Sequence, residues 1–195
     1  KLLPALTRLV GMFAFAILDT REEKLLLARD SFGIKPLYYA EGEGGFAFAS
    51  EIPALLQTPW IRRRVQPQRI YQYLRFGITD YGGNTLLEGV QQVPAAHYLE
   101  VPLRGTGTPV LTRYWRLSPE PRQDLSFAEA ATRLRELFLE NIRLHLRSDV
   151  PVGLALSGGV DSSAIVAAMR HLEPGMDLRA VSYCASGTAV DESRW

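Results

Sequence analysis

Short apolar runs alternate with polar turns along the first part of the chain, a pattern that predicts antiparallel strands. The apolar run 12–18, the polar segment 19–23 and the apolar segment 24–28 together predict a β-hairpin with both strands largely buried. Segments 36–40 and 46–49 flank a glycine-rich turn and alternate large and small side chains, as neighbouring antiparallel strands do. We therefore expect a sheet in this part of the chain.

A helix and one more strand complete this first part. Segment 67–76 opens with a proline, carries apolar residues at helical spacing and is followed by a glycine, so we predict a short helix there. We expect a loop over 79–89 and a strand over 96–101. The glycine-rich stretch 105–109 is predicted to be a turn or linker.

The pattern then changes to one of helices and parallel strands. Ser126 with Glu129 three residues later predicts a capping box, which opens a long helix whose apolar residues recur close to helical period. A strand over 152–156, a helix over 161–172 and a strand over 178–184 follow. This β-α-β order implies a parallel sheet with a crossover helix.

The sequence therefore predicts two domains, with a boundary where prolines and polar residues interrupt the apolar pattern. The first, residues 1–118, belongs to the α+β class and contains an antiparallel sheet. The second, residues 119–195, belongs to the α/β class and contains the start of a parallel sheet.

Composition excludes several classes of partner. The chain has 195 residues with 22 Lys plus Arg and 21 Asp plus Glu, so no charge surplus points to a nucleic acid. No apolar window is long enough to cross a bilayer, and the single cysteine, Cys184, excludes an internal disulfide. We expect a cytoplasmic protein with neither a nucleic acid nor a membrane as partner.

The candidate chemistry lies in segment 157–163, which reads SGGVDSS between a predicted strand and a predicted helix. Two glycines let backbone N–H groups turn inward, three hydroxyls add donors, and the helix N-terminus adds partial positive charge. Such a cradle suits a phosphate chain. A carboxylate beside phosphate becomes useful when Mg²⁺ bridges the two, so Asp161 is the candidate metal ligand. The candidate ligands of the phosphates are Ser157, Gly158, Gly159, Asp161, Ser162 and Ser163.

A purely structural interpretation of the same segment stays open. A Gly-Gly turn followed by an ordinary helix N-cap would also use serine and aspartate. The segment is not a Walker A loop, because that motif's glycine spacing and lysine are missing. The order of strand, loop and helix favours the phosphate-binding interpretation.

Segment 156–163 resembles the SGGxDS signature of the PP-loop ATP pyrophosphatases. The flanking segments 148–153 and 191–193 are similar to those of glutamine-hydrolysing asparagine synthetases. Segments 11–16, 28–30 and 33–39 resemble the later half of the glutaminase domain of that same family, which has an N-terminal-nucleophile amidohydrolase fold. The resemblance covers nearly the whole chain.

The resemblance implies that 1–118 is the C-terminal part of a glutaminase domain and 119–195 the N-terminal part of an ATP-dependent synthetase domain. It implies the cofactors ATP and Mg²⁺, with aspartate and glutamine as further substrates. MgATP would adenylate the aspartate side chain, releasing pyrophosphate, and glutamine-derived ammonia would displace AMP. Ala155, Leu156 and Tyr183 would contact the nucleoside. Dimers are common in the family, so a homodimer is a further expectation.

The departures from the family pattern limit these expectations. The family's cysteine nucleophile at the mature N-terminus is absent from this sequence, and no catalytic residue is assigned. We expect Cys184 to be a buried thiol on the second strand of the β-α-β unit, without a catalytic task. The chain is expected to be an internal part of a longer enzyme and inactive by itself.

Two other functions stay open. A related ATP-dependent amidotransferase or β-lactam-synthetase-like cyclase would use the same plan on another carboxylate acceptor. A non-catalytic nucleotide-binding relative would keep the fold and lose the chemistry.

Overall fold

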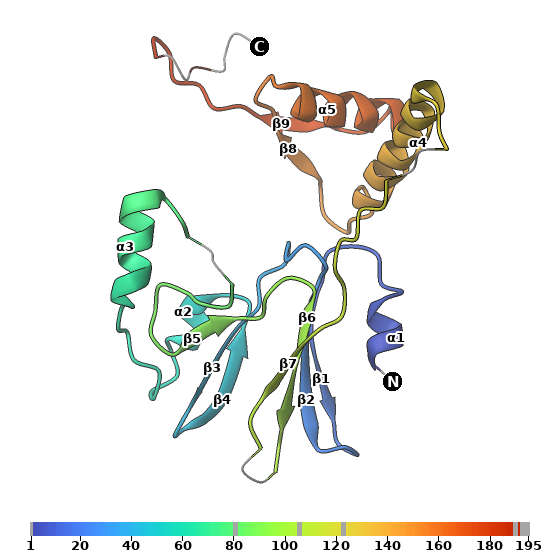
Figure 1. Ribbon diagram of the computed structural model, residues 1–195. Coiled ribbons are helices and arrows are strands. Elements are labelled where there is room, and N and C mark those ends of the chain that lie inside the picture. Colours follow the sequence, from blue (N-terminus) through green and yellow to red (C-terminus); the bar gives the residue numbers. More distant parts are fainter. Residues whose placement is uncertain (1, 80–81, 105–106, 122–123, 189–190, 192–195) are drawn as a thin grey trace. The chain divides into compact units, whose positions relative to one another are not determined.

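The chain folds into two compact units, Lys1–Ser118 and Pro119–Trp195, each described below by itself (Figure 1). The computed structural model describes residues 2–79, 82–104, 107–121, 124–188 and 191. No helix within these ranges combines the length and apolar character that a membrane span requires.

A four-stranded antiparallel sheet forms the first part of the first unit, in the order β1-β2-β6-β7. The predicted hairpin is confirmed: Asp19 of β1 lies opposite Lys24 of β2. The strand predicted over 96–101 is also present, as β6, and it pairs with the other edge of β2. The strands of this sheet are β1 (Ala14–Asp19), β2 (Lys24–Arg29), β6 (His97–Pro102) and β7 (Val110–Arg113).

A second, three-stranded antiparallel sheet has the order β4-β3-β5. The glycine-rich turn joins β3 and β4 as predicted, with Gly42 opposite Gly45. An ideal Cβ at Gly44 would lie 2.1 Å from Trp60 Cδ1, so the indole covers this turn and leaves no room for a side chain. The strands are β3 (Tyr38–Gly42), β4 (Gly45–Ala49) and β5 (Val90–Gln92).

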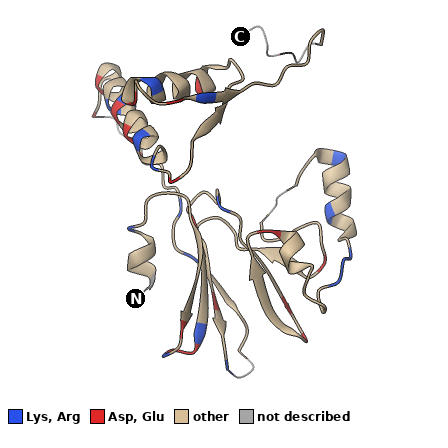
Figure 2. Ribbon diagram, turned by 180° about the vertical axis from the view of Figure 1, so that it is seen from behind, with Lys and Arg blue, Asp and Glu red and all other residues tan. Residues whose placement is uncertain are grey.

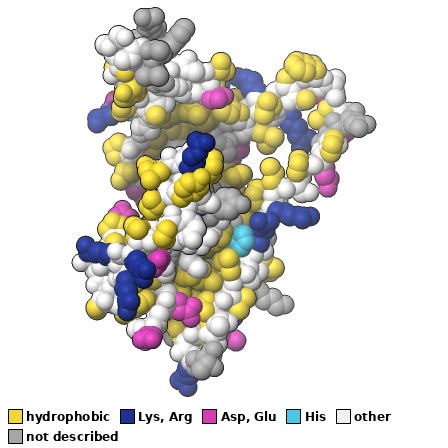
Figure 3. Space-filling model, turned by 60° about the vertical axis from the view of Figure 1, so that its left-hand side comes forward, with side chains coloured by type: hydrophobic (Ala, Val, Ile, Leu, Met, Phe, Trp, Pro, Cys, Tyr) yellow, Lys and Arg dark blue, Asp and Glu magenta, His cyan; other side chains and the backbone are white. Residues whose placement is uncertain are grey.

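Among the described residues of this unit, three helices accompany the sheets: α1 (Leu2–Leu6), α2 (Ile52–Leu55) and α3 (Pro67–Phe76). The bounds of α3 match the prediction, and Gly77 ends the helix in the left-handed conformation at φ 68°. Several apolar side chains of α3, including Leu74 and Phe76, are exposed. Figure 3 shows one face of the molecule, with hydrophobic side chains interspersed among charged ones.

The main core of the first unit joins its two sheets. Leu27 and Leu99 from the first sheet are almost completely buried against Leu37, which precedes β3, and Val93, which follows β5. Tyr39 and other half-buried residues pack around them. Each such aliphatic side chain stabilises the fold by about 1.5–3 kcal/mol, so this cluster accounts for much of the unit's stability.

The hairpin differs from the prediction in one respect. The middle of β2 is buried, but Ile17 and Leu18 of β1 are exposed. Within the described ranges β1 pairs with β2 alone and lies at the edge of its sheet. The prediction that both strands are largely buried is therefore wrong for β1, because the described core clusters reach only its first half, through Ala14 and Phe15.

A buried aspartate organises the turn that follows β2. Asp30 is 1% exposed, and its carboxylate accepts four backbone N–H groups. Oδ1 accepts from Phe32 at 3.1 Å and Ile34 at 3.0 Å, and Oδ2 accepts from Lys35 at 2.9 Å and Phe13 at 3.3 Å. Burial by itself raises the pKa of Asp30, but the four N–H donors outweigh it and hold the pKa below its ordinary value.

The neighbouring arginine ties the same turn to the second sheet. The Arg29 guanidinium donates to the carbonyl oxygens of Lys35 and Gly33, each at 2.7 Å, and to that of Val93 at 2.8 Å. It also donates to Gln92 Oε1 at 3.1 Å. Through these contacts Arg29 holds the turn in place against the residues that end β5.

The second unit contains the predicted β-α-β order. A long helix, α4 (Phe127–His145), precedes β8 (Gly153–Ala155), α5 (Val160–Leu172) and β9 (Arg179–Val181), and the two strands are parallel. Ile142 of α4 and Ala168 and Met169 of α5 form the buried core, against which Leu154 of β8 packs. Basic and acidic residues are intermixed along α4 (Figure 2).

Two expectations for the second unit are wrong. β9 ends at Val181, so Tyr183 and Cys184 lie after the strand and not on it. Cys184 is exposed, which contradicts the prediction of a buried thiol. Both errors have one cause. An apolar run predicts a strand, but the strand forms only where a neighbouring strand pairs with it. Because β8 is three residues long, β9 pairs over three residues and ends at Val181.

Candidate phosphate-binding loop

The loop of residues 157–159 lies between the end of β8 and the start of α5. Gly158 has φ 74°, a left-handed conformation that L side chains rarely adopt. Gly159 is the N-cap of α5 in an extended conformation, with φ −69° and ψ 161°. The Gly-Gly pair therefore reverses the chain at the strand end and starts the helix directly afterwards.

Side-chain hydroxyls hold the two ends of this loop together. Ser162 Oγ donates to the Gly159 carbonyl oxygen at 3.2 Å and accepts the Ser157 N–H at 3.3 Å. Ser157 Oγ lies 3.2 Å from Ser162 Oγ and accepts the Gly159 N–H at 3.4 Å. The Ser163 N–H donates to the Gly159 carbonyl oxygen at 3.0 Å, which closes the first turn of α5.

The N-termini of α4 and α5 differ in a way that matters for anion binding. At α4 a complete capping box is present, as predicted: Ser126 Oγ accepts the Glu129 N–H at 3.3 Å, and Glu129 Oε2 accepts the Ser126 N–H at 2.9 Å. The hydrogen bond from the Ser126 hydroxyl lowers the pKa of Glu129. At α5 no side chain caps the helix.

The uncapped N-terminus of α5 leaves backbone donors for a ligand. Across the described parts of the chain, no hydrogen bond occupies the N–H groups of Val160, Asp161 or Ser162. Free N–H groups and the partial positive charge of the helix end favour an anion at this position. Sequence reasoning did not include Val160, because its side chain is apolar and only its position after a glycine N-cap marks its N–H as a donor.

Asp161 lies in the first turn of α5 and is exposed. Within the described ranges no hydrogen bond or ion pair engages its carboxylate, and oxygen donors of this kind suit Mg²⁺. The described residues contain no cluster of three or more His, Cys, Asp or Glu able to hold a metal ion. A single carboxylate next to a phosphate cradle therefore fits a Mg²⁺ whose other ligands are phosphate and water oxygens.

The residues predicted to contact a nucleoside lie near the ends of the two parallel strands. Ala155 pairs with Val181, the last residue of β9, and the Leu156 N–H donates to the Val181 carbonyl oxygen at 2.9 Å. Tyr183 follows two residues later and is 65% exposed. The structure thus brings Ala155 and Leu156 to the end of β9, with Tyr183 in the segment that leaves it.

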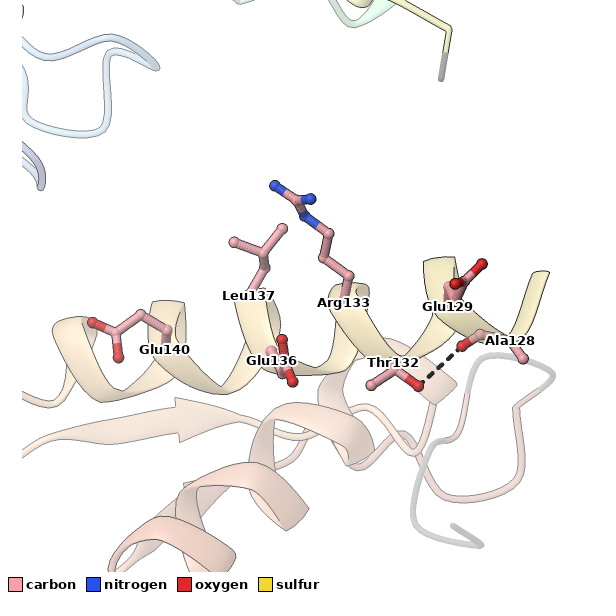
Figure 4. Close-up of a pocket in the computed structure, with 7 residues that line it drawn as sticks. All are labelled: Ala128, Glu129, Thr132, Arg133, Glu136, Leu137 and Glu140. Atoms are coloured by element: carbon pink, nitrogen blue, oxygen red, sulfur yellow. Dashed lines mark hydrogen bonds between the residues drawn. The ribbon is translucent and has the colours of Figure 1, made fainter. Parts of the chain in front are cut away.

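A surface hollow of the second unit lies elsewhere, along α4 (Figure 4). Arg133 and Leu137 extend from one side of the helix, and Thr132 Oγ1 donates to the Ala128 carbonyl oxygen at 2.9 Å. Glu129 is engaged in the capping box, and Glu140 is paired with Arg143 at 2.7 Å. Because its described lining comes from a single exposed helix, this hollow provides no enclosed binding site.

Comparisons with known proteins agree with the order of the two units. Residues 4–115 match the family model described as glutamine amidotransferase domain, and residues 133–195 match the model described as asparagine synthase. The two matches fall one in each compact unit.

The chain is also similar to several curated proteins. It is 37% identical over 164 residues to asparagine synthetase [glutamine-hydrolyzing] 3 of Bacillus subtilis, which covers 84% of this chain and 26% of that protein. It is 37% identical over 177 residues to a putative asparagine synthetase [glutamine-hydrolyzing] of Mycobacterium tuberculosis, covering 85% and 26%. It is 34% identical over 170 residues to amidase chry2 of Gibberella zeae, covering 86% and 24%.

The chain thus spans about a quarter of the length of these relatives. The glutamine amidotransferase model alone covers more than half of the chain, and the asparagine synthase model matches the residues that follow it. The chain belongs to the family of glutamine-hydrolysing asparagine synthetases.

Proposed function

We propose that the whole protein is an asparagine synthase that uses glutamine as nitrogen donor. In this proposal, residues 1–118 are the C-terminal part of an N-terminal-nucleophile glutaminase domain. Residues 119–195 are the first part of a PP-loop synthetase domain that adenylates the aspartate side chain. The observation that carries the proposal is the uncapped N-terminus of α5 behind the Gly158-Gly159 turn, in a chain of this family.

In this proposal the loop binds the phosphates of ATP through backbone N–H groups and hydroxyls. The N–H groups of Val160, Asp161 and Ser162 lie at the positive end of α5, and Ser157 and Ser163 add exposed hydroxyls. Ala155, Leu156 and Tyr183 contact the nucleoside from the strand ends. Because the donors are fixed before the reaction, they stabilise the charge that develops on the departing pyrophosphate without reorganising.

Asp161 would hold Mg²⁺ together with phosphate oxygens. When bound, the metal ion neutralises phosphate charge and makes the pyrophosphate a better leaving group. The chain's own contribution is to hold a carboxylate in the first turn of the helix, next to the loop. Activation of a carboxylate as an acyl-adenylate then gives ammonia an electrophile that it can attack, with AMP as leaving group.

Some relatives of the chain carry a name other than asparagine synthetase. Two fungal relatives carry the name amidase, at 34% identity for chry2 of Gibberella zeae and 32% for chyE of Penicillium rubens. The family therefore includes proteins with other names, and the experiment must distinguish aspartate from another carboxylate acceptor. A cytoplasmic location and a homodimer stay predictions.

The test is a screen of carboxylate acceptors for pyrophosphate release by the whole protein with MgATP and ammonia. We expect release with aspartate, and a loss of about a hundredfold or more in Asp161→Asn, since removing one such charge-stabilising group typically has an effect of that size. Asp177→Asn is the matched control, because Asp177 is exposed in the same unit and pairs only with Arg179 at the surface within the described ranges.

Each outcome has a distinct meaning. Release with another acceptor and not with aspartate would contradict asparagine synthesis and support the alternative. Equal release by Asp161→Asn and the parent protein would contradict the role of Asp161. No release with any acceptor would favour a binding protein without chemistry.

A further inference from the structure

The three hydroxyls of segment 157–163 occupy different environments. Ser157 and Ser163 are exposed, whereas Ser162 is half-buried. Ser162 Oγ donates to the Gly159 carbonyl oxygen and accepts the Ser157 N–H, and it lies 3.2 Å from Ser157 Oγ. In the described parts of the chain, no hydrogen bond engages the hydroxyl of Ser163.

These contacts span the whole turn. Ser157 is the first residue of the loop after β8, Gly159 is the N-cap of α5, and Ser162 is the third residue of the helix. One hydroxyl therefore connects the strand side of the loop with the helix side. The curvature that Gly158 permits at φ 74° is in this way fixed by Ser162.

The hydrogen-bond inventory of a hydroxyl limits what else Ser162 can do. A hydroxyl has a single O–H donor, and that of Ser162 points to the Gly159 carbonyl oxygen. While this bond persists, the Ser162 side chain cannot donate to a phosphate oxygen. Its backbone N–H, which no described group accepts, stays available for a ligand.

We propose that Ser162 is a positioning residue: its hydroxyl holds the 157–163 loop in the curvature that directs the backbone N–H groups toward a common anion, and it does not bind the anion itself. This inference rests on the proposed function in so far as the anion is a phosphate chain. It changes the role of the Ser162 side chain from ligand to internal brace.

The experiment compares three variants of the whole protein: Ser162→Ala, Ser162→Thr and Ser163→Ala. The first removes the brace, the second keeps a hydroxyl at the same position, and the third removes an exposed hydroxyl from the adjacent residue. One measurement is hydrogen exchange of the Ser157 amide in the absence of ligand. The other is binding of inorganic pyrophosphate with Mg²⁺ by calorimetry, together with kcat and KM for MgATP.

We expect the Ser157 amide to exchange about tenfold faster in Ser162→Ala, because a typical hydrogen bond of this kind restrains opening by about that factor. Ser163→Ala should leave this exchange rate unchanged, and Ser162→Thr should restore it. Pyrophosphate affinity should fall about tenfold in Ser162→Ala, with kcat for MgATP reduced more than KM is raised.

Unchanged exchange of the Ser157 amide in Ser162→Ala, together with weaker pyrophosphate binding, would overturn the proposal and make the hydroxyl a direct ligand. Faster exchange with unchanged pyrophosphate binding would also overturn it, because the brace would then have no effect on the site. Failure of the proposed function is a separate result, namely no pyrophosphate release by the parent protein. The exchange and calorimetric measurements still decide the role of Ser162 in that case.

Discussion

Replacing Asp30 by asparagine tests whether the buried carboxylate holds the turn after β2. Its two oxygens each accept two backbone N–H groups, so an amide would turn one acceptor into a donor facing two donors. A hydrogen bond to a charged group contributes about 1.5–3 kcal/mol, so the loss of two gives about 3 kcal/mol or more. The bond from Phe13, at 3.3 Å, is the longest of the four, which places the cost at the lower end of this range.

Asp19→Asn is the matched control. Asp19 also accepts two backbone N–H groups, from Arg21 and Glu22, but both go to the same oxygen, Oδ1, at 3.0 Å. An asparagine can keep that oxygen as its carbonyl and lose neither bond. Asp19→Asn should therefore shift the unfolding midpoint much less than Asp30→Asn does.

The assay is chemical denaturation of the protein followed by tryptophan fluorescence, since Trp60 and Trp115 both lie in the first unit. At neutral pH the free energy of unfolding of Asp30→Asn should fall by about 3 kcal/mol, a large part of a typical total of about 5–15 kcal/mol. A loss below about 1 kcal/mol, or one equal to that of Asp19→Asn, would refute the reasoning.

The stabilisation by the Asp30 carboxylate should also depend on pH in a definite direction. The folded protein holds the pKa of Asp30 below its ordinary value of 3.8, because the four N–H donors outweigh the effect of burial. Such a group contributes its full stabilisation above its unfolded pKa and loses it as pH falls through the folded pKa. The stability difference between the parent protein and Asp30→Asn should therefore be constant above about pH 5 and shrink below pH 3.8.

Two further changes test the turns of the first unit. Gly44→Ala should lower the free energy of unfolding by about 1–3 kcal/mol, because the new Cβ would lie 2.1 Å from Trp60 Cδ1. Gly175→Ala is the control, since a Cβ there meets no atom within 4 Å. An unchanged unfolding midpoint for Gly44→Ala, or a loss equal to that of Gly175→Ala, would contradict the clash. Glu23→Gly should raise stability by about 0.5–1 kcal/mol in 1 M salt, because Glu23 has a left-handed φ of 50° and salt screens its exposed ion pair with Arg104. A lower midpoint for Glu23→Gly in high salt would show that its conformation is not strained.

Elements bounded by residues with strong local preferences were predictable from the sequence. The proline before and the glycine after α3 mark both of its ends, and the Ser126–Glu129 capping box marks the start of α4. The Gly-Gly turn before α5 was likewise evident, because glycine alone adopts φ 74° readily. At these positions the local chemistry of a few residues decides the backbone.

Features that depend on distant partners were not predictable in this way. β5 and β7 were missed, since both are short and exist through pairing with β3 and β6. The exposure of β1 and of Cys184 depends on which strands lie next to them. At the candidate site, the motif was evident, but the inward orientation of the Ser162 hydroxyl required the three-dimensional structure.

The position of β2 between β1 and β6 has a consequence for synthesis on the ribosome. Lys24 Nζ donates to Glu100 Oε1 at 3.0 Å, a contact between residues 76 positions apart in the sequence. At about 5–20 residues per second, β6 emerges roughly 4–15 seconds after β2. During that interval the β1–β2 hairpin has no neighbour for its second edge, and its apolar residues, including Leu27, stay accessible to chaperones and to other nascent chains.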